Sequence, residues 1–333
     1  MMSKEPNGSW IIGVDIGGTN INVGAVPYDG GPPLAFRSEV TDAQRGAKFV
    51  VDRVVKMIRD SIQDVMEHEG CQPDEFIGVG IGSPGPLDRK TGTVISTPNL
   101  GWRNFPLRDL IQNAVGLPAT LDNDANAATY GEWWLGAGRS VSTLVGVTLG
   151  TGIGGGVVLN GELYHGAADA AAEIGHMTID STGRKCKCGN YGCLEAYASG
   201  PAIAARAIEG LELGASSILP ELAGDLVNIT AETVFDAVVQ GGPYATEVMH
   251  DTAKFLGVGL ANIINILNPE MLVISGGVTR AGDHLFVPLR TEVRRRAFRV
   301  AEQSCRIVAS ELQGKAGVIG AVACFKREIF GDV

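Results

Sequence analysis

The chain has 333 residues, of which 45% are hydrophobic and 19% are charged. This composition is typical of well-packed α/β proteins, and it excludes intrinsic disorder over most of the chain. The length suits two domains better than one. Because 27 Lys and Arg stand against 37 Asp and Glu, the net charge is −10, and we expect no nucleic acid as the principal partner. The net charge does not exclude a small anionic ligand that binds at a local site.

Targeting and membrane segments are not expected from the sequence. Residues 1–9 are polar and lack the basic start, apolar run and cleavage site of a signal peptide, and no apolar stretch reaches membrane-spanning length. We therefore expect a cytoplasmic protein without a membrane partner. Three of the six cysteines fall together at Cys186, Cys188 and Cys193, which suggests a metal site before a disulfide.

The first 140 residues alternate predicted strands and helices. Two apolar runs around the turn at residues 17–19 predict a β-hairpin, and apolar residues at helical spacing predict an amphipathic helix over 43–67. In chain order, the expected strands are 10–15, 22–26, 36–40, 76–81 and 119–122, and the expected helices are 43–67, 107–115 and 126–136. This alternation is typical of an α/β protein.

The second half repeats the order of the first. A strand run ending at Leu149 enters a turn of glycine and threonine, and another strand returns over 155–159. A helix over 252–267 then leads to a buried strand over 271–275 that ends at two glycines. The two similar halves favour a duplicated α/β unit with a cleft between two lobes, although any α/β protein offers matches of a strand followed by glycine.

Three glycine-rich turns follow predicted strands. Side chains do not cover the backbone N–H groups of such turns, which can therefore bind phosphate oxygens, with threonine hydroxyls as further donors. Most such turns are only tight turns, and none matches the P-loop or dinucleotide pattern. Two turns related by the apparent repeat nevertheless favour a phosphate site, and the third suits a nucleotide base or ribose. The turns are Asp15-Ile16-Gly17-Gly18-Thr19, Leu149-Gly150-Thr151-Gly152 and Gly276-Gly277.

Two aspartates lie between a predicted strand and a predicted helix, where open α/β sheets bind ligands. The segment 121–126 reads Leu-Asp-Asn-Asp-Ala-Asn. In one interpretation Asp122 or Asp124 caps the helix, which is the common role of an aspartate at a helix start. In the other, a carboxylate acts as a general base that accepts a hydroxyl proton, while Asn123 hydrogen-bonds to neighbouring hydroxyls. The local sequence leaves both interpretations open.

Cysteine and histidine form the strongest local pattern. Three thiolates and one imidazole complete the closed tetrahedral shell of structural zinc sites, and exposed or disulfide-linked cysteines are the disfavoured alternative. A closed shell leaves no position for an activated water, so the Zn²⁺ is expected to stabilise a loop. Glu173 and Glu195 flank the ligands and are suited to binding sugar hydroxyls. The predicted zinc ligands are His176, Cys186, Cys188 and Cys193.

In their order along the chain, these motifs resemble the ROK family (repressors, open reading frames, kinases) and, within it, the bacterial ATP-dependent glucokinases. The resemblance covers nearly the whole chain, from the turn that begins at Asp15 to Ser275-Gly276-Gly277. It implies the duplicated ribonuclease H-like fold of actin, hexokinase and Hsp70 ATPases. We expect a small lobe over 1–122, a large lobe over 123–314 with the zinc loop, and a last helix over about 315–330 packed back on the small lobe.

The resemblance also implies ATP-dependent phosphorylation of glucose at the 6-hydroxyl, with Mg²⁺ and structural Zn²⁺. Asp124 looks like the catalytic base, and Asn123, Glu173, His176 and Glu195 look like sugar ligands, so that His176 would bind both zinc and sugar. Asp15 looks like the residue that holds hydrated Mg²⁺. The residues that look like the ATP site are Asp15, Gly17, Gly18, Thr19, Gly150, Thr151, Gly152, Gly276 and Gly277.

Two positions depart from the family pattern, and the family also offers alternative functions. Asn20 stands where many relatives have Lys, and Ala172 stands where Gly often precedes the glutamate. The alternatives are a ROK kinase for fructose, mannose or N-acetylmannosamine, a polyphosphate-dependent glucokinase, and a sugar-binding ROK repressor. We do not expect a repressor, because the first strand begins near Trp10 and leaves no room for its DNA-binding domain. The family suggests a homodimer or a higher homo-oligomer.

Overall fold

The structure is a computed structural model that describes residues 8–97 and 99–333. Most of the polar N-terminal segment, for which no signal peptide is expected, lies outside the described residues. The chain forms two compact units. Unit 1 comprises the chain up to Ser140, residues 156–171 and residues 311–333, whereas unit 2 comprises residues 141–155 and 172–310.

A five-stranded sheet forms the centre of unit 1. Its strand order is β3-β2-β1-β4-β8, with β1 antiparallel to β2 and parallel to β4, and β4 parallel to β8. The predicted hairpin and the following strands are therefore present. The bounds are β1 (Trp10–Ile16), β2 (Asn20–Pro27), β3 (Leu34–Val40), β4 (Phe76–Ser83) and β8 (Ala119–Asn123).

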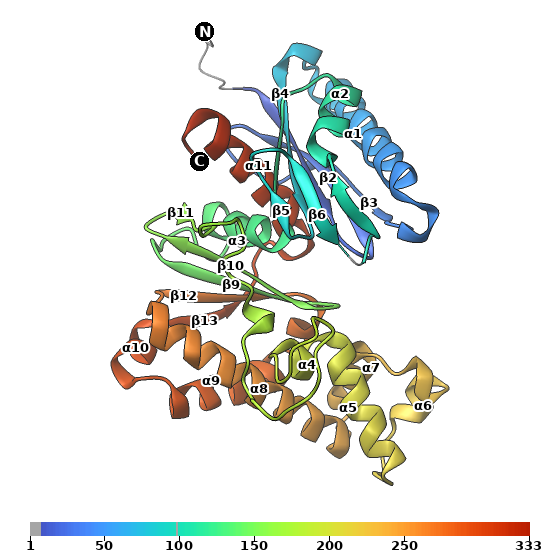
Figure 1. The fold of residues 1–333 in the computed structure, drawn as a ribbon, viewed down its shortest axis with the longest axis vertical. Helices are drawn as coiled ribbons and strands as arrows, with labels where there is room; N and C mark the ends of the chain where they lie inside the picture. Colours follow the sequence, from blue (N-terminus) through green and yellow to red (C-terminus); the bar gives the residue numbers. More distant parts are fainter. Residues whose placement is uncertain (1–7, 98) are drawn as a thin grey trace. The chain divides into compact units, whose positions relative to one another are not determined.

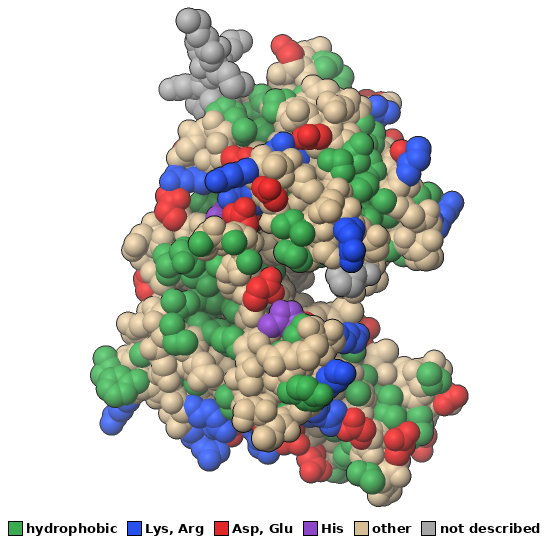
Figure 2. Space-filling view, in the orientation of Figure 1, with side chains coloured by type: hydrophobic (Ala, Val, Ile, Leu, Met, Phe, Trp, Pro, Cys, Tyr) green, Lys and Arg blue, Asp and Glu red, His purple; other side chains and the backbone are tan. Residues whose placement is uncertain are grey.

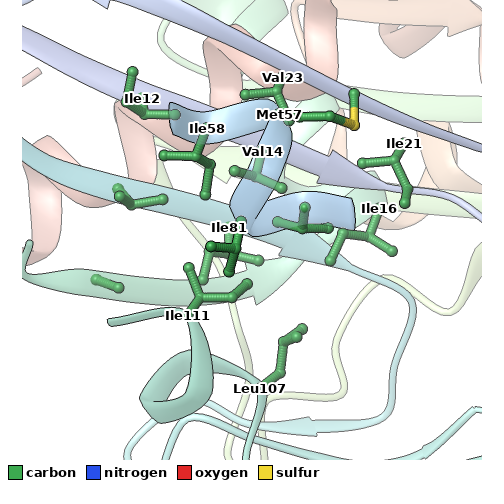
Figure 3. Close-up of a cluster of buried hydrophobic side chains, with 14 of the residues drawn as sticks. Ile12, Val14, Ile16, Ile21, Val23, Met57, Ile58, Ile81, Leu107 and Ile111 are labelled. Carbon is green, nitrogen blue, oxygen red and sulfur yellow. The ribbon is translucent and has the colours of Figure 1, made fainter. Parts of the chain in front are cut away.

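Helices cover both faces of this sheet. Side chains alternate between the two faces of a strand, so Ile12 and Val14 of β1 pack with Met57 and Ile58 of α1 (Ala47–Glu69), as Figure 3 shows. Ile11 points to the opposite face and packs with α11 (Ala316–Phe330). Helix α2 (Leu107–Val115) completes the first layer. A small sheet follows β4, with strands β5 (Leu87–Asp88), β6 (Thr93–Thr97) and β7 (Trp102–Phe105).

Helix α3 (Asp124–Trp134) packs closely on α11. A Cβ atom at Gly320 would lie 1.6 Å from the carbonyl oxygen of Ala127, and one at Gly131 would lie 2.4 Å from that of Ala316. The two helices can approach this closely only because both positions are glycine. For this reason residues 123–140 belong to unit 1, whereas the sequence suggested a boundary at 122/123.

A second five-stranded sheet repeats the first. Its order is β11-β10-β9-β12-β13, which matches the order of the first sheet strand by strand, and β12 is parallel to both β9 and β13. The bounds are β9 (Leu144–Leu149), β10 (Ile153–Leu159), β11 (Glu162–Leu163), β12 (Met271–Ser275) and β13 (Arg306–Ala309). The same topology in two sheets confirms the predicted duplicated α/β fold.

Unit 2 is rich in helices (Figure 1). The predicted helix over 252–267 is the C-terminal part of α8, which begins earlier, with a proline in its first turn, and ends at Asn268 in the left-handed conformation. The sequence analysis did not predict the other helices of this unit. The bounds are α4 (Glu195–Ala198), α5 (Gly200–Glu212), α6 (Leu219–Ala223), α7 (Ala231–Val239), α8 (Pro243–Leu267), α9 (Asp283–Arg296) and α10 (Arg299–Ser304).

Acidic and basic side chains are intermixed on the face of the molecule shown in Figure 2. Within residues 8–97 and 99–333, no helix combines the length and the apolar character that crossing a membrane requires.

Candidate functional site

The first glycine-rich turn connects β1 to β2 in unit 1. The N–H of Gly17 donates to the carbonyl of Asn20 at 2.8 Å, and the hydroxyl of Thr41 donates to the carbonyl of Gly17 at 2.8 Å. Asp15, at the end of β1, is half-buried and accepts a hydrogen bond from Asn22 Nδ2 at 3.1 Å. Burial raises the pKa of Asp15, and the Asn22 hydrogen bond offsets only part of this effect. The turn is thus fixed beside a carboxylate that has one amide partner.

A cavity of about 540 Å³ borders this turn. Gly18 and Thr19 contribute to its wall, and Asn99 comes close to Gly18 from the loop between β6 and β7. The volume is within the range of small-molecule sites. The sequence analysis did not assign Asn99, because a single asparagine in a loop has no pattern of its own. The lining residues are Gly18, Thr19, Val40, Asp42, Ala43, Gln44, Asn99, Leu100 and Gly101.

The start of α3 resolves the question of which residue caps the helix. Asn123 is the N-cap, and its Oδ1 accepts from the N–H groups of Ala125 at 2.9 Å and Asn126 at 3.1 Å. Its Nδ2 is the amide atom that could donate to a ligand. Asp124 is the first helical residue and is half-buried, whereas Asp122 is only 2% exposed. Of the two aspartates, Asp124 is therefore the one that a substrate could contact.

Half-buried charged and titratable side chains surround the buried Asp122. Its Oδ2 lies 2.8 Å from His165 Nε2 and 3.0 Å from Arg89 Nε, the latter an ion pair without hydrogen-bond alignment. Burial alone would raise the pKa of Asp122, but the hydrogen bond and charge of His165, together with Arg89, lower it below its usual value. The sequence analysis missed Arg89 and His165, because each lies more than 30 residues from Asp122 and only the fold brings them together.

The second and third glycine-rich turns meet in unit 2. Gly150 and Thr151, after β9, and Gly277, after β12, line one cavity of about 530 Å³ with residues of α5 and α7. Gly276 has a φ of 101°, and a Cβ there would lie 1.9 Å from the carbonyl oxygen of Leu149, so this approach requires glycine. The remaining lining is mostly apolar. It comprises Leu149, Gly200, Pro201, Ala204, Ala205, Ile208, Ile229, Thr230, Ala231, Glu232 and Val278.

The predicted zinc ligands also meet in unit 2. The ligand atoms of His176, Cys186, Cys188 and Cys193 all lie within 4.8 Å of one another. The Sγ atoms of Cys188 and Cys193 are 3.7 Å apart, and Cys186 Sγ is 3.9 Å from His176 Nδ1. Zn–S bonds of about 2.3 Å place tetrahedral sulfur ligands about 3.8 Å apart. The donor set and its spacing therefore fit Zn²⁺.

The loop that carries the cysteines is held by its own backbone. The N–H of Cys186 donates to the carbonyl of Asn190 at 2.8 Å, and the N–H of Leu194 donates to that of Met177 at 2.9 Å. At Gly192, φ is 72° and a Cβ would lie 1.6 Å from the carbonyl oxygen of Asp180. Burial raises the pKa of the Cys193 thiol to about 12, so metal binding there must displace a proton.

Glu195 connects the zinc loop to the second glycine-rich turn. Its Oε2 accepts from the N–H of Ile153 at 2.9 Å, and its Oε1 lies 3.9 Å from Cys186 Sγ. A Cβ at Gly152 would lie 2.5 Å from Oε2. Glu173 is exposed and precedes the 3₁₀ turn that ends at His176. Within unit 2, Glu195 thus lies beside Cys186, and Glu173 precedes the turn that carries His176.

Comparison with known proteins identifies the family. The ROK family profile matches residues 11–328. The chain is 40% identical over 322 residues to the glucokinase of Thermotoga maritima, and the match covers 96% of this chain and 98% of that protein. The chain belongs to the ROK family.

Other ROK family members include both kinases and regulators. A solved structure with 34% identity and a TM-score of 0.82 is a ROK family glucokinase from Streptomyces griseus in complex with glucose and AMPPNP, and the match covers 95% of this chain and 99% of that one. The chain is also 33% identical to the xylose repressor of Caldicellulosiruptor bescii over 82% of this chain and 68% of that protein. Family membership therefore establishes the fold and leaves the choice between kinase and regulator to the site.

Proposed function

We propose that this ROK family protein is an ATP-dependent glucokinase that phosphorylates the 6-hydroxyl of glucose. The observation that carries the proposal is the start of α3, where a half-buried carboxylate, Asp124, follows an asparagine that caps the helix. The 40% sequence identity of the chain to a glucokinase, over 96% of its length, supports the same proposal. The glucose and AMPPNP complex of a relative supports the substrate pair.

Asp124 is proposed as the general base. It accepts the proton of the 6-hydroxyl as that oxygen forms a bond to the γ-phosphorus, while the bond between the γ-phosphorus and the bridging oxygen breaks and ADP leaves. Asn123 donates from Nδ2 to a sugar hydroxyl, and the carboxylates of Glu173 and Glu195 accept from others. Positioning provides most of the acceleration, because the transition state needs in-line oxygens rather than a strong base.

The cavity of unit 2 suits the nucleotide. Its apolar wall on α5 and α7 would accept the base, and the turns at Gly150 and Gly277 would present N–H groups to the phosphates. Asp15 fits a site for hydrated Mg²⁺, since its half-buried carboxylate has one neutral amide partner. Mg²⁺ would supply charge neutralisation at the β- and γ-phosphates.

Zn²⁺ is proposed as a structural ion. His176, Cys186, Cys188 and Cys193 would hold it, and the closed shell would fix the segment between Glu173 and Glu195. His176 would then bind zinc through one ring nitrogen and the sugar through the other. We further propose a cytoplasmic homo-oligomer, which light scattering of the purified protein would test.

A coupled ADP-release assay tests the proposed function. Glucose, fructose, mannose, N-acetylmannosamine and xylose are compared with ATP or polyphosphate as the phosphoryl donor. We expect the highest kcat/KM with glucose and ATP. A higher value with another hexose would identify a different ROK kinase. Sugar binding without turnover of any substrate would contradict the proposal and favour the regulator class, which the identity to a xylose repressor makes the second candidate.

A further inference from the structure

The carboxylate of Asp122 is the centre of a cluster that draws on four segments of unit 1. Beyond its contacts with Asp122, Arg89 pairs with Glu328 on α11, at 3.0 Å, and lies 3.9 Å from Asp169. Arg89 directly follows β5, Asp122 is the second-last residue of β8, and His165 and Asp169 follow β11. A guanidinium and an imidazole therefore meet a buried carboxylate where these segments converge.

The buried charge of Asp122 destabilises the folded state unless Arg89 and His165 stay in place. An ionised carboxylate removed from water needs opposite charge and hydrogen-bond donors to remain stable. Asp122 has both, because Arg89 provides the charge and His165 and two further N–H groups provide donors. The geometry of the cluster is therefore tightly determined.

The second oxygen of the same carboxylate reaches the proposed catalytic residues. Asp122 Oδ1 accepts from the backbone N–H of Asn123 at 2.8 Å and from Asn126 Nδ2 at 3.3 Å. Asn123 in turn caps α3 through Ala125 and Asn126. Asp124 lies between these fixed points, so its backbone direction depends on where Asp122 is held.

We propose that Asp122 is a positioning residue for catalysis, and that its charged carboxylate, held by Arg89 and His165, fixes Asn123 and Asp124 against the sugar hydroxyls. The proposal rests on the proposed kinase function. Asp122 is not itself the base, because it is 2% exposed and its two oxygens are engaged by protein donors.

The test is steady-state kinetics on purified full-length Asp122→Asn, His165→Gln and the double variant, with glucose and ATP. Asparagine keeps the shape and one acceptor but removes the charge. We expect kcat to fall roughly 10- to 100-fold in Asp122→Asn, because small displacements of reacting groups have effects of this size. The KM for ATP should change less than about twofold. The double variant should be no slower than Asp122→Asn, since both changes disrupt one unit.

Glu132→Gln is the matched control. Glu132 is also 2% exposed and lies on the same helix, but its carboxylate accepts from the N–H groups of Ala137 and Leu312 at the far end. This variant should lose thermal stability and keep its kcat. Circular dichroism confirms that each variant is folded at the assay temperature.

The outcomes separate the inference from the proposed function. A wild-type protein that phosphorylates no hexose refutes the function and the inference with it. An active wild type with a folded Asp122→Asn variant whose kcat stays within about twofold overturns the inference alone. An equal fall of kcat in Glu132→Gln also overturns it, because the effect would then be general destabilisation.

Discussion

Asp122, Asn123 and Asp124 are neighbours in sequence but have different environments. Asp122 is buried beside Arg89 and His165. Asn123 caps α3 with its side-chain oxygen, and Asp124 is half-buried at the first helical position. One short turn from strand to helix therefore separates a buried carboxylate from one that a substrate could contact. This separation is the reason for assigning proton transfer to Asp124.

Replacing Asp124 with asparagine should remove the base and preserve the shape of the helix start. We expect kcat with glucose and ATP to fall at least about 100-fold, since general bases contribute factors of 10² to 10⁴. The affinity for glucose, measured by isothermal titration calorimetry, should change only modestly. Near-normal turnover would contradict the assignment, and Asp109→Asn, on the exposed side of α2, serves as a control that keeps its activity.

The residues of the site differ in how visible they are to sequence analysis. The spacing of the cysteines and the histidine predicted that these four side chains meet, because all four lie within 18 residues and their chemistry is distinctive, while the binding of zinc stays a prediction. By contrast, Arg89 and His165 join Asp122 only through tertiary structure. Asn99 likewise reaches the first glycine-rich turn from a distant loop. Local spacing therefore predicts short-range ligand sets and misses buried ion pairs between segments.

At the scale of elements, the zinc loop combines a short 3₁₀ turn with the start of α4. Cys188→Ser should release zinc, measured by plasma mass spectrometry, because a closed four-ligand shell loses most of its affinity with one ligand. The loop should then loosen, and the KM for glucose should rise at least about tenfold, equal to 1.4 kcal/mol. Cys305→Ser, in the same unit but outside the cluster, is the control. Unchanged glucose binding in a zinc-free variant would refute the stabilising role.

The contact between α3 and α11 depends on two glycines. A Cβ at Gly320 would meet the backbone oxygen of Ala127 at 1.6 Å, and a backbone carbonyl cannot move aside without bending its helix. Gly320→Ala should therefore reduce the free energy of unfolding by about 1–3 kcal/mol or more, measured by urea denaturation. Gly314→Ala, where a Cβ would meet no atom within 4 Å, should change it far less. Equal stabilities would contradict the close packing.

The elements that sequence analysis predicted best are those with buried, periodic faces. Strands β1, β2, β4 and β8 and helix α1 match their predicted ranges within a few residues, because each buries an apolar pattern. Helices α5 to α7 were missed, since α5 and α6 begin with a proline in their first turn, and α6 and α7, with 5 and 9 residues, are too short for a clear helical period. Helix α3 begins two residues earlier than predicted, because the cap is Asn123 rather than an aspartate.

At the scale of the whole molecule, the two sheets share one strand order, but the turns that follow their equivalent strands lie beside residues with different roles in the proposed reaction. The glycine-rich turn after β1 adjoins Asp15, whereas the turn after β9 adjoins Glu195 and the apolar cavity. Duplication explains why both turns occur at equivalent places. The cluster of three cysteines and one histidine follows β10, in the second of the two halves.

The free energy of unfolding of the whole protein should depend on acidic pH through the buried carboxylate of Asp122. The pKa of Asp122 is lower in the folded state than its ordinary value of 3.8, so the folded state binds fewer protons than the unfolded chain over this range. Its contribution is complete above about pH 4 and is lost as the pH falls through the lowered folded-state pKa, at up to about 1.4 kcal/mol per pH unit. Burial raises the pKa of Glu328 and the charge of Asp122 adds to this rise, so Glu328 acts in the opposite sense and this opposing contribution becomes smaller in Asp122→Asn.

Asp122→Asn should therefore be less stable than wild type at pH 7, because Arg89 and His165 lose their anion. The difference should narrow as the pH falls below about 4, because the unfolded wild-type chain takes up a proton at Asp122 before the folded state does. Urea denaturation between pH 7 and pH 3 measures both curves. Asp74→Asn, an exposed position, controls for the loss of one negative charge and should follow the wild-type curve. A constant difference across the whole range would mean that the charge of Asp122 adds nothing to the stability of the fold.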